Sequence, residues 1–427
     1  MSINEDDKKV IAFKRKRRPR ELPSLDFPDI TATGIIRPTC ANARIAINKL
    51  EISCGYDVFH DKLLIGGQPI GQYAGELSDH ACLYLRKLID GKFGFDPGRN
   101  NIFDACVQLA LENSFDPVVD YLDSLEWDGT PRIDEWLPTY LGAEDTKLNR
   151  VIGRLALLAQ VKRARSPGCK FDQIIVVESP EGWMKSTALE ILAGGPGYFS
   201  DQTILGKSDK EQQELLRGVW VYEIADLTNM PKAEVEHVKA FASRTHDRAR
   251  PAYGRARIDL PRRGVIYATT NNSEYLKSQT GNRRFWPVKV IRPIDIEGLK
   301  RDRDQLLAEA AYFEAAGASI VLPQELWSAA ADEQEQRREA DPWEDVLREV
   351  RGTICDIGDL KTEERVLSQK LLSFLGIPID RQKGPDLKRV GEAMRNLGWK
   401  GPKVMRVGEQ RGRGFWRLAR AAANAPL

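Results

Sequence analysis

The stretch from residue 171 to residue 192 constrains the fold more than any other part of the chain. Its first nine residues, FDQIIVVES, form an apolar run rich in β-branched residues, which predicts a buried strand. A loop with a central glycine, Gly182, follows, and a helical sequence then runs from about Ser186 to Leu192. This order of strand, loop and helix is typical of an α/β domain with a parallel sheet.

The loop partly matches the phosphate-binding pattern G-x-x-x-x-G-K-[ST]. Lys185 and Ser186 supply the lysine and the hydroxyl, and Thr187 follows them. Ser179 and Met184, however, stand where the pattern has glycines, which permit a positive φ and a close approach of the backbone. The pattern alone therefore leaves three interpretations open: a working ATP site, a decayed site, or a chance match.

In a working site these residues divide the tasks of binding ATP and Mg²⁺. Lys185 would neutralise the β- and γ-phosphates, and Ser186 would bind Mg²⁺. Gly182 and Thr187 belong to the loop and the helix start, whose amides would hold phosphate oxygens. We therefore predict these four residues as the nucleotide-binding set, with ATP and Mg²⁺ as cofactors.

Two further apolar runs predict strands that end in polar residues. Residues 217–227, RGVWVYEIADL, contain four strand residues (219–222) before Glu223, with Asp226 three positions later. A carboxylate there would hold Mg²⁺ and polarise the attacking water, so Glu223 is a predicted metal ligand and both acids are predicted catalytic residues. Residues 265–276, VIYATTNNSEYL, contain an apolar strand that ends in the polar residues TTNN, and an asparagine there could orient that water.

Paired arginines follow in TGNRRFWPV, residues 280–288. Arg283 or Arg284 would act as a finger that stabilises the charge of the transition state. Phosphate loop, acidic strand, polar-ended strand and arginines in this order predict a P-loop ATPase core of the ring-forming type over residues 126–295.

The net charge is only +2, but the basic residues are segregated. Residues 1–20 hold eight Lys and Arg against three acids, and residues 381–420 hold twelve against three. Residues 241–263 hold seven Arg against two Asp. Three basic patches favour a nucleic-acid partner over a role in solubility.

The flanking regions predict smaller domains. Residues 1–30 resemble a basic disordered tail, and residues 31–125 a small mixed α/β domain. Residues 296–355 predict a helical lid or linker. Residues 356–427 predict two helices and a hairpin, the pattern of a winged-helix-like DNA-binding domain, with a protein-contact domain as the alternative. The candidate DNA contacts there are Lys388, Arg389, Arg406, Arg411 and Arg413.

Three further stretches of the sequence predict helices. Residues 79–93 and 101–114 have helical spacing, the second with Asn101 or its neighbour as a cap. Residues 362–376, TEERVLSQKLLSFLG, have the same spacing. Residues 56–67 predict a strand or hairpin that ends at a glycine.

Cysteine usage and hydropathy predict a cytoplasmic protein. The six cysteines form no C-x-x-C pair, which fits a reducing compartment without structural zinc. Cys54, His60, His80 and Cys82 have irregular spacing, and ordinary buried or surface roles are favoured over zinc ligation. No apolar run reaches the roughly 18 residues of a membrane span, and the N-terminus does not read as a signal peptide.

Four stretches resemble the virulence-associated protein E family of phages, prophages and genomic islands. They are DSLEWDGTPRIDEWLPTYLGAED, GCKFDQIIVVES leading into GWMKST, VKAFASRTHDRARPAYGR, and TTNNSEYLKSQTGNRRFWPVKV. The resemblance is densest over residues 115–345. That family belongs with the superfamily 3 helicase-like ATPases of the AAA+ class.

The resemblance implies a hexameric ring that moves single-stranded DNA by using ATP. Matching positions imply the same phosphate loop, acidic strand, sensor Asn271 and arginine finger as above. They also imply a pore hairpin that would grip DNA through Arg250, Arg255 and Arg257. Related proteins often carry a primase domain ahead of this core, but the short N-terminal segment shows no polymerase carboxylates, so primase activity is not expected.

The sequence thus predicts an ATP-dependent DNA helicase or translocase that replicates a phage or mobile element. Its predicted partners are single-stranded or forked DNA, further copies of the chain, and host or phage replication proteins. Two alternatives stay open: a DNA-binding replication or regulatory protein with a structural ATP site, and an ATPase that remodels or packages DNA without unwinding it. A drifting site would have lost some of its chemical groups, so a working but unusual loop is favoured over a decayed one.

Overall fold

The structure is a computed structural model, and it describes residues 27–227, 230–249, 258–276, 281–339, 341–356 and 362–418. The chain forms two compact units, Met1–Ser124 and Leu125–Leu427, and each is described by itself. Within the described ranges, no helix is long and apolar enough to cross a membrane.

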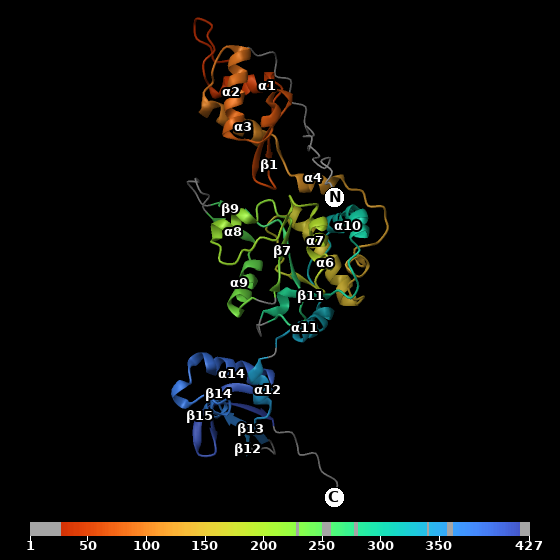
Figure 1. The fold of residues 1–427 in the computed structure, drawn as a ribbon, viewed down its shortest axis with the longest axis vertical. Coiled ribbons are helices and arrows are strands. Elements are labelled where there is room, and N and C mark those ends of the chain that lie inside the picture. The colour runs from red at the N-terminus through yellow and green to blue at the C-terminus, as the bar shows by residue number, and fades with distance from the viewer. Residues whose placement is uncertain are drawn as a thin grey trace. The chain divides into compact units, whose positions relative to one another are not determined.

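The first unit packs helices on a small sheet (Figure 1). The strands have the order β3-β2-β1-β4, and β1 and β2 form the predicted hairpin. Its core lies between this sheet and the first three helices, with Ile47, Ile65, Leu85 and Ile102 completely buried. The elements are α1 (Cys40–Lys49), β1 (Ser53–Asp57), β2 (Lys62–Gly66), the 3-10 turn η2 (Gln68–Tyr73), β3 (Gly75–Glu76), α2 (Asp79–Phe93), α3 (Arg99–Glu112), β4 (Ser114–Phe115) and α4 (Pro117–Ser124).

The predicted helix cap at Asn101 or its neighbour is wrong, because the N-cap residue is Gly98. Helix α3 begins at Arg99, because Gly98 adopts a φ of 79° and turns the chain into the helix three residues before Asn101. Asn101 lies in the first turn, and its amide donates instead to the carbonyls of Pro38 (2.7 Å) and Pro97 (2.8 Å).

The second unit is built on a five-stranded sheet with the order β11-β5-β10-β7-β6. Every neighbouring pair in it is parallel, which confirms the predicted α/β class. The strands are β5 (Ile174–Glu178), β6 (Phe199–Ser200), β7 (Val221–Ile224), β10 (Val265–Thr270) and β11 (Phe285–Lys289). A separate antiparallel hairpin joins β8 (His246–Ala249) and β9 (Ile258–Pro261).

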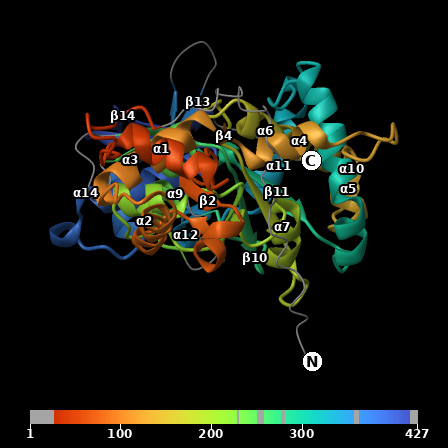
Figure 2. The same cartoon turned by 90° about the horizontal axis from the view of Figure 1, so that it is seen from above.

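Helices cover both faces of this sheet (Figures 1 and 2). Ile174 and Val176 of β5 share a core with Val238 and Phe241 of α9, while α6, α7 and α10 lie together on the other side. The helices are α5 (Trp136–Thr139), α6 (Lys147–Arg165), α7 (Lys185–Ala193), α8 (Asp209–Leu215), α9 (Lys232–Ala242), α10 (Ile296–Ala315) and α11 (Trp327–Gln336), with 3-10 turns η4 (Asn282–Arg284) and η5 (Gln324–Leu326).

Strand β7 begins two residues later than predicted. Gly218 has a φ of 71° and closes a turn in which the amide of Val219 donates to Leu216. Pairing therefore starts at Val221, and Glu223 lies within the strand opposite Tyr267 rather than after the strand.

The C-terminal residues of this unit form an antiparallel sheet with the order β12-β13-β15-β14, packed against helices. The predicted helix over residues 362–376 is wrong in its first half, which is strand β13. Val366 pairs there with Phe415, and both enter the core beside Leu371. The elements are α12 (Pro342–Arg348), β12 (Thr353–Asp356), β13 (Thr362–Leu367), α13 (Ser368–Phe374), η6 (Ile379–Arg381), α14 (Gly384–Asn396), β14 (Lys400–Val407) and β15 (Gln410–Leu418).

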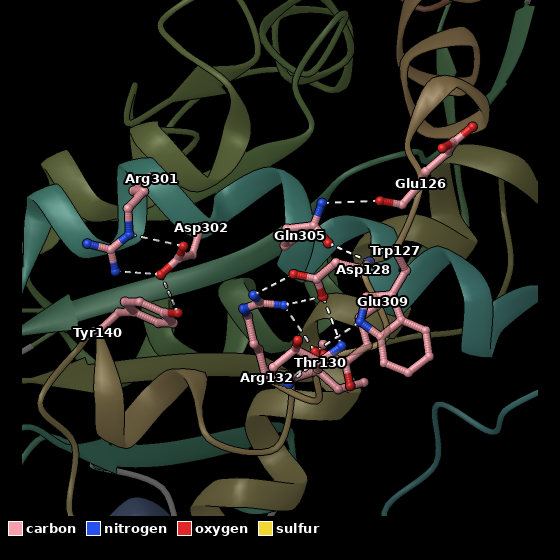
Figure 3. Close-up of polar contacts among 11 residues, drawn as sticks. Glu126, Trp127, Asp128, Thr130, Arg132, Tyr140, Arg301, Asp302, Gln305 and Glu309 are labelled. Atoms are coloured by element: carbon pink, nitrogen blue, oxygen red, sulfur yellow. Dashed lines mark hydrogen bonds and ion pairs between the residues drawn. The ribbon is translucent and has the colours of Figure 1, made fainter.

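The turn at residues 126–132 is fastened to helix α10 (Figure 3). Gln305 accepts a hydrogen bond from the amide of Asp128 (2.9 Å) and donates one to the carbonyl of Glu126 (3.1 Å). The carboxylate of Glu309 accepts from the amides of Arg132 (2.6 Å) and Ile133 (3.0 Å). Since Glu309 is only 2% exposed, burial raises the pKa of its carboxyl group.

Helix α10 also fixes the end of helix α7. Nε of Arg303 donates to the carbonyl of Leu192 at 3.3 Å, where α7 ends at Gly194 in a left-handed conformation. A cation at a helix C-terminus satisfies free carbonyls and interacts favourably with the helix dipole. The turn at 126–132 and the C-terminal end of α7 are therefore both held by α10.

Candidate nucleotide-binding site

Residues 179–184 connect the carboxyl end of β5 to the start of α7. Gly182 has a φ of 81°, and Met184, directly before the helix, has a φ of 60° and a ψ of 34°. Met184 thus adopts the left-handed conformation for which the phosphate-binding pattern uses glycine, at a cost of roughly 1–2 kcal/mol for a residue with a Cβ atom. The missing glycine does not prevent the loop conformation.

The other replaced glycine, Ser179, contributes a hydroxyl group to the loop. Ser179 is buried, and its Oγ donates to the carbonyl of Pro180 at 2.9 Å. The same oxygen accepts a hydrogen bond from Nζ of Lys185 at 3.0 Å. Ser179 therefore serves as a partner of the loop lysine.

The ammonium group of Lys185 lies inside the loop. It donates to the carbonyls of Ser179 (3.0 Å) and Pro180 (3.2 Å) and to Oδ1 of Asn271 (2.7 Å). Burial lowers the pKa of this lysine, which lies among dipoles rather than against a carboxylate. Phosphate oxygens placed in the loop would replace these neutral acceptors with charged ones.

Glu223 lies beside the start of α7. Its Oε1 accepts hydrogen bonds from Ser186 Oγ (2.9 Å) and Thr269 Oγ1 (2.6 Å). The residue is 1% exposed, and burial raises the pKa of its carboxyl group. Its Oε2 is buried and has no hydrogen-bond partner among the described residues. An orphaned carboxylate oxygen beside a hydroxyl is a donor set that fits a divalent cation or its water.

These groups border one cavity of about 420 Å³, a size within the usual range for ligand pockets. It is lined by Glu181, Gly182, Trp183, Met184, Lys185, Ser186, Thr187, Glu223, Ala225, Asp226, Thr269, Thr270 and Asn271. The structure therefore brings together all four predicted nucleotide-binding residues and three predicted catalytic residues, Glu223, Asp226 and Asn271. Asp226 has a φ of 50° at the end of β7.

Sequence reasoning assigned no role to five further residues that line this cavity, Glu181, Trp183, Ala225, Thr269 and Thr270. Thr269 lies on β10 two positions after Tyr267, which pairs with Glu223. Because alternate residues of a strand face the same side of the sheet, this spacing was the sequence signal that could have identified Thr269. Trp183 occupies a variable position of the loop pattern, and no sequence signal marks its role.

The paired arginines lie away from the cavity of their own chain. They precede β11, whose first residue Phe285 pairs with Ile174, the first residue of β5. Nε of Arg284 donates to Ser243 Oγ at 2.9 Å and lies 3.4 Å from Asp172 Oδ2, before β5. The loop follows β5 at its other end, and five strand residues span about 16 Å at ~3.3 Å each. The arginines and the loop are thus at opposite ends of the sheet.

The predicted DNA contacts fall into three groups. Arg250, Arg255 and Arg257 lie outside the described residues. Arg389 on α14 is engaged: it binds both oxygens of Asp341 (2.8 Å each) and stacks 4.0 Å from the ring of Trp343. Lys388 on the same helix is exposed.

The third group lies on the hairpin β14–β15. Arg406 is directly opposite Arg411, and Arg413 is opposite Val404, so the three arginines share one face. All three are exposed. Like charges directly opposite each other destabilise a hairpin, and an anionic partner would relieve this repulsion.

The four residues considered for zinc do not form a metal site. In the described part of the chain, no group of three or more His, Cys, Asp or Glu side chains is arranged to hold a metal ion. Cys54 and Cys82 belong to the core of the first unit, and His60 Nδ1 lies 2.7 Å from Asp57 Oδ2 within the β1–β2 turn.

A sequence model described as the virulence-associated protein E-like domain matches residues 122–339, just over half of the 427-residue chain. The chain belongs to this family. The family resemblance predicted from the four sequence stretches is confirmed. The matched region of this virulence-associated protein E-like protein contains the whole parallel sheet and every residue of the cavity.

Solved structures add a likeness in fold. The apo structure of the NrS-1 C-terminal region is 9% identical, with a TM-score of 0.50, covering 87% of this chain and 98% of that chain. The A form apo structure of the same region is 9% identical, with a TM-score of 0.48, covering 89% and 99%. No curated protein matches the sequence.

Proposed function

We propose that this virulence-associated protein E-like protein is an ATP-dependent DNA helicase or translocase that acts in replication of a phage or mobile element. The observation that carries the proposal is the convergence of Lys185, Ser186, Glu223 and Asn271 on one cavity. These residues come from the carboxyl ends of β5, β7 and β10 or the segment that follows, where ligands bind in open α/β sheets.

The cavity residues fit ATP and Mg²⁺. Lys185 and the amides of the loop would hold the phosphates, and Ser186 with Glu223 would hold Mg²⁺, which supplies charge neutralisation on the phosphates when bound. The carboxyl group of Glu223 has a raised pKa, which makes its carboxylate a stronger base toward the attacking water. Asn271 would orient that water, and Asp226 is the second carboxylate at the same edge of the cavity.

The strand pairing supports a P-loop ATPase core of the AAA+ class. The strand before the phosphate loop pairs with the polar-ended strand, which pairs with the acidic strand, so the three sequence features meet at one edge. The C-terminal helices α13 and α14 with the hairpin β14–β15 support a winged-helix-like domain.

The position of Arg283 and Arg284 supports assembly into a ring. An arginine at the amino end of β5 lies too far from the loop of its own chain to reach the phosphates. It would complete the cavity of a neighbouring copy in a head-to-tail ring, and such contacts close into a hexamer when the rotation between copies is right. Single-stranded or forked DNA is the proposed substrate, and Lys388, Arg406, Arg411 and Arg413 are candidates among the described residues to contact it.

The replacement of both pattern glycines, by Met184 and Ser179, supports a second candidate function. A DNA-binding replication or regulatory protein with a structural ATP site would keep the cavity but lose turnover. An ATPase that remodels or packages DNA would hydrolyse ATP without separating strands.

ATP hydrolysis with and without single-stranded DNA separates these functions. We expect hydrolysis that DNA stimulates and that Lys185→Ala abolishes, whereas Lys300→Ala, at an exposed position on α10, leaves it unchanged. ATP binding without turnover would contradict the motor and support the structural site. Turnover without separation of a forked duplex would support remodelling or packaging.

A further inference from the structure

A buried ion pair lies directly behind the phosphate loop. Glu178, the last residue of β5, receives three hydrogen bonds from the guanidinium of Arg337, from Nε to Oε1 (2.9 Å) and Oε2 (3.2 Å) and from Nη2 to Oε2 (3.0 Å). The hydroxyl of Tyr275 donates to the same Oε1 at 2.5 Å. The side chains of Arg337 and Glu178 are only 7% and 8% exposed.

The backbone of Arg337 joins a second part of the site. Its carbonyl accepts hydrogen bonds from the amides of Tyr275 (3.0 Å) and Leu276 (2.9 Å), and Leu276 in turn accepts from the amide of Glu339 (3.2 Å). Residues 275 and 276 belong to the segment that follows β10 and carries Asn271. Arg337 therefore binds both the strand before the loop and the segment with the partner of Lys185.

The neighbouring residue, Arg338, binds one of the C-terminal helices. It binds both oxygens of Glu344 on α12, at 3.0 and 3.1 Å. Glu344 also accepts from the side-chain amide of Asn396 on α14 at 2.5 Å. Two adjacent arginines thus connect Glu178 beside the loop to two helices of the C-terminal region.

A buried ion pair contributes little net stability compared with apolar residues of the same volume, because both charges lose their hydration. Such a pair instead favours one arrangement of the elements that it joins. Here the elements are the start of the phosphate loop and the segment with Asn271, whose separation sets the contact between Lys185 and Asn271.

We propose that Arg337 is a positioning residue of the nucleotide site. Its guanidinium and carbonyl hold the loop and the Asn271 segment in the arrangement needed for hydrolysis, and Arg338 joins the same residues to α12 and α14. The inference rests on the proposed function, because it requires ATP to bind in the cavity.

The decisive variant is the double substitution Glu178→Gln with Arg337→Met, which removes both buried charges and leaves only the partly exposed carboxylate of Glu333, a second partner of Arg337, without its arginine. We expect it to fold and to bind a fluorescent ATP analogue with a Kd within about threefold of wild type, while kcat falls at least about tenfold. Arg337→Lys keeps the charge but loses the planar guanidinium that donates to both oxygens of Glu178, and it should have an intermediate kcat. Arg348→Met on the exposed side of α12 is the matched control and should have no effect.

Hydrogen exchange at the amides of Leu276 and Glu339 provides a test on the unaltered protein. We expect the ATP analogue to slow exchange at both amides in wild type but not in the double variant. If wild type binds no nucleotide, the proposed function fails and the inference falls with it. If wild type binds nucleotide without slower exchange at these amides, or if a folded double variant keeps the wild-type kcat, only the role of Arg337 is overturned. If the double variant does not fold, the hydrogen-exchange rates of wild type and the kcat of Arg337→Lys test the role of Arg337 instead.

Discussion

Nζ of Lys185 lies 2.7 Å from Oδ1 of Asn271, although the two residues are 86 positions apart in the chain. The contact exists because β5 and β10 are parallel neighbours, so the residues that follow their carboxyl ends meet at one edge of the sheet. It joins the loop that would hold the phosphates to the segment that would orient water. The strength of this contact decides how easily the lysine turns toward a bound phosphate.

Substitution of Asn271 tests this relationship. Asn271→Asp places a carboxylate against Lys185, which strengthens the existing contact and competes with phosphate for the ammonium group. We expect the Kd of a fluorescent ATP analogue to rise about tenfold, equal to ~1.4 kcal/mol. The matched control is Asn272→Asp, one residue further on. Unchanged affinity in Asn271→Asp would show that Lys185 does not bind the nucleotide.

Met184 permits a test of backbone strain. Its side chain is 52% exposed, so its removal costs little burial, while its left-handed φ is strained. We expect Met184→Gly to be as stable as wild type or up to about 1 kcal/mol more stable, since glycine relieves strain but loses more chain entropy on folding. Met184→Val, whose branched Cβ fits this region poorly, should be less stable than Met184→Leu. Thermal unfolding of the three variants measures the order, and equal stability of the three would contradict the left-handed conformation.

The buried carboxyl group of Glu223 predicts a pH dependence of stability. Because burial raises its pKa above the ordinary 4.5, the folded protein binds this proton more tightly than the unfolded chain does. Its contribution is therefore most favourable below pH 4.5 and is lost as the pH rises through the raised pKa. Glu223→Gln keeps the shape without the charge, so its stability advantage over wild type should grow between pH 4 and pH 7. Urea unfolding across this range measures it, and a constant difference between the proteins would contradict the raised pKa.

The parts of the site that could be predicted from the sequence lie close to strand ends. The apolar run before Ser179 and the one around Glu223 both mark buried strands, and parallel strands bring their carboxyl ends to one edge. Arg284 could not be placed in this way, because its position depends on the register of β11 against β5, which no local pattern encodes. The prediction of a helix over residues 362–376 fails for β13, because the apolar pattern that includes Leu371 and Leu372 of α13 continues into β13 without a visible break.

The pairing of Glu178 with Arg337 was also beyond sequence reasoning. The two residues are 159 positions apart, and Arg337 lies in a charged stretch that resembles a solvated helix face. Only the packing of α11 beside β11 brings this arginine to the end of β5. Burial of a charge is decided by such distant packing rather than by neighbours in the sequence.

The attachment of the turn at residues 126–132 to α10 predicts a stability effect at Glu309. Glu309→Ala removes the acceptor of two backbone amides, one of them buried, and leaves them unpaired. We expect the free energy of unfolding to fall by about 2–4 kcal/mol. Glu325→Ala at an exposed ion pair with Lys147 is the control and should change it by less than about 1 kcal/mol. Urea unfolding measures both, and a loss at Glu309 no larger than at Glu325 would contradict the role of α10 as a support.

The separation of Arg284 from the cavity predicts complementation between subunits. Lys185→Ala damages the cavity and Arg284→Ala damages the finger, so each variant alone should lack DNA-stimulated ATP hydrolysis. In mixed rings, an Arg284→Ala subunit keeps an intact cavity, and a Lys185→Ala neighbour supplies the missing arginine. For random equal mixing, about a quarter of the interfaces contain both intact parts, and activity should return to about that fraction. A mixture of Lys185→Ala with Glu223→Gln, which are both damaged in the cavity, should stay inactive at every ratio. Failure of the first mixture, with exchange of subunits verified by labelled protein, would exclude Arg284 as the arginine that acts across the subunit boundary.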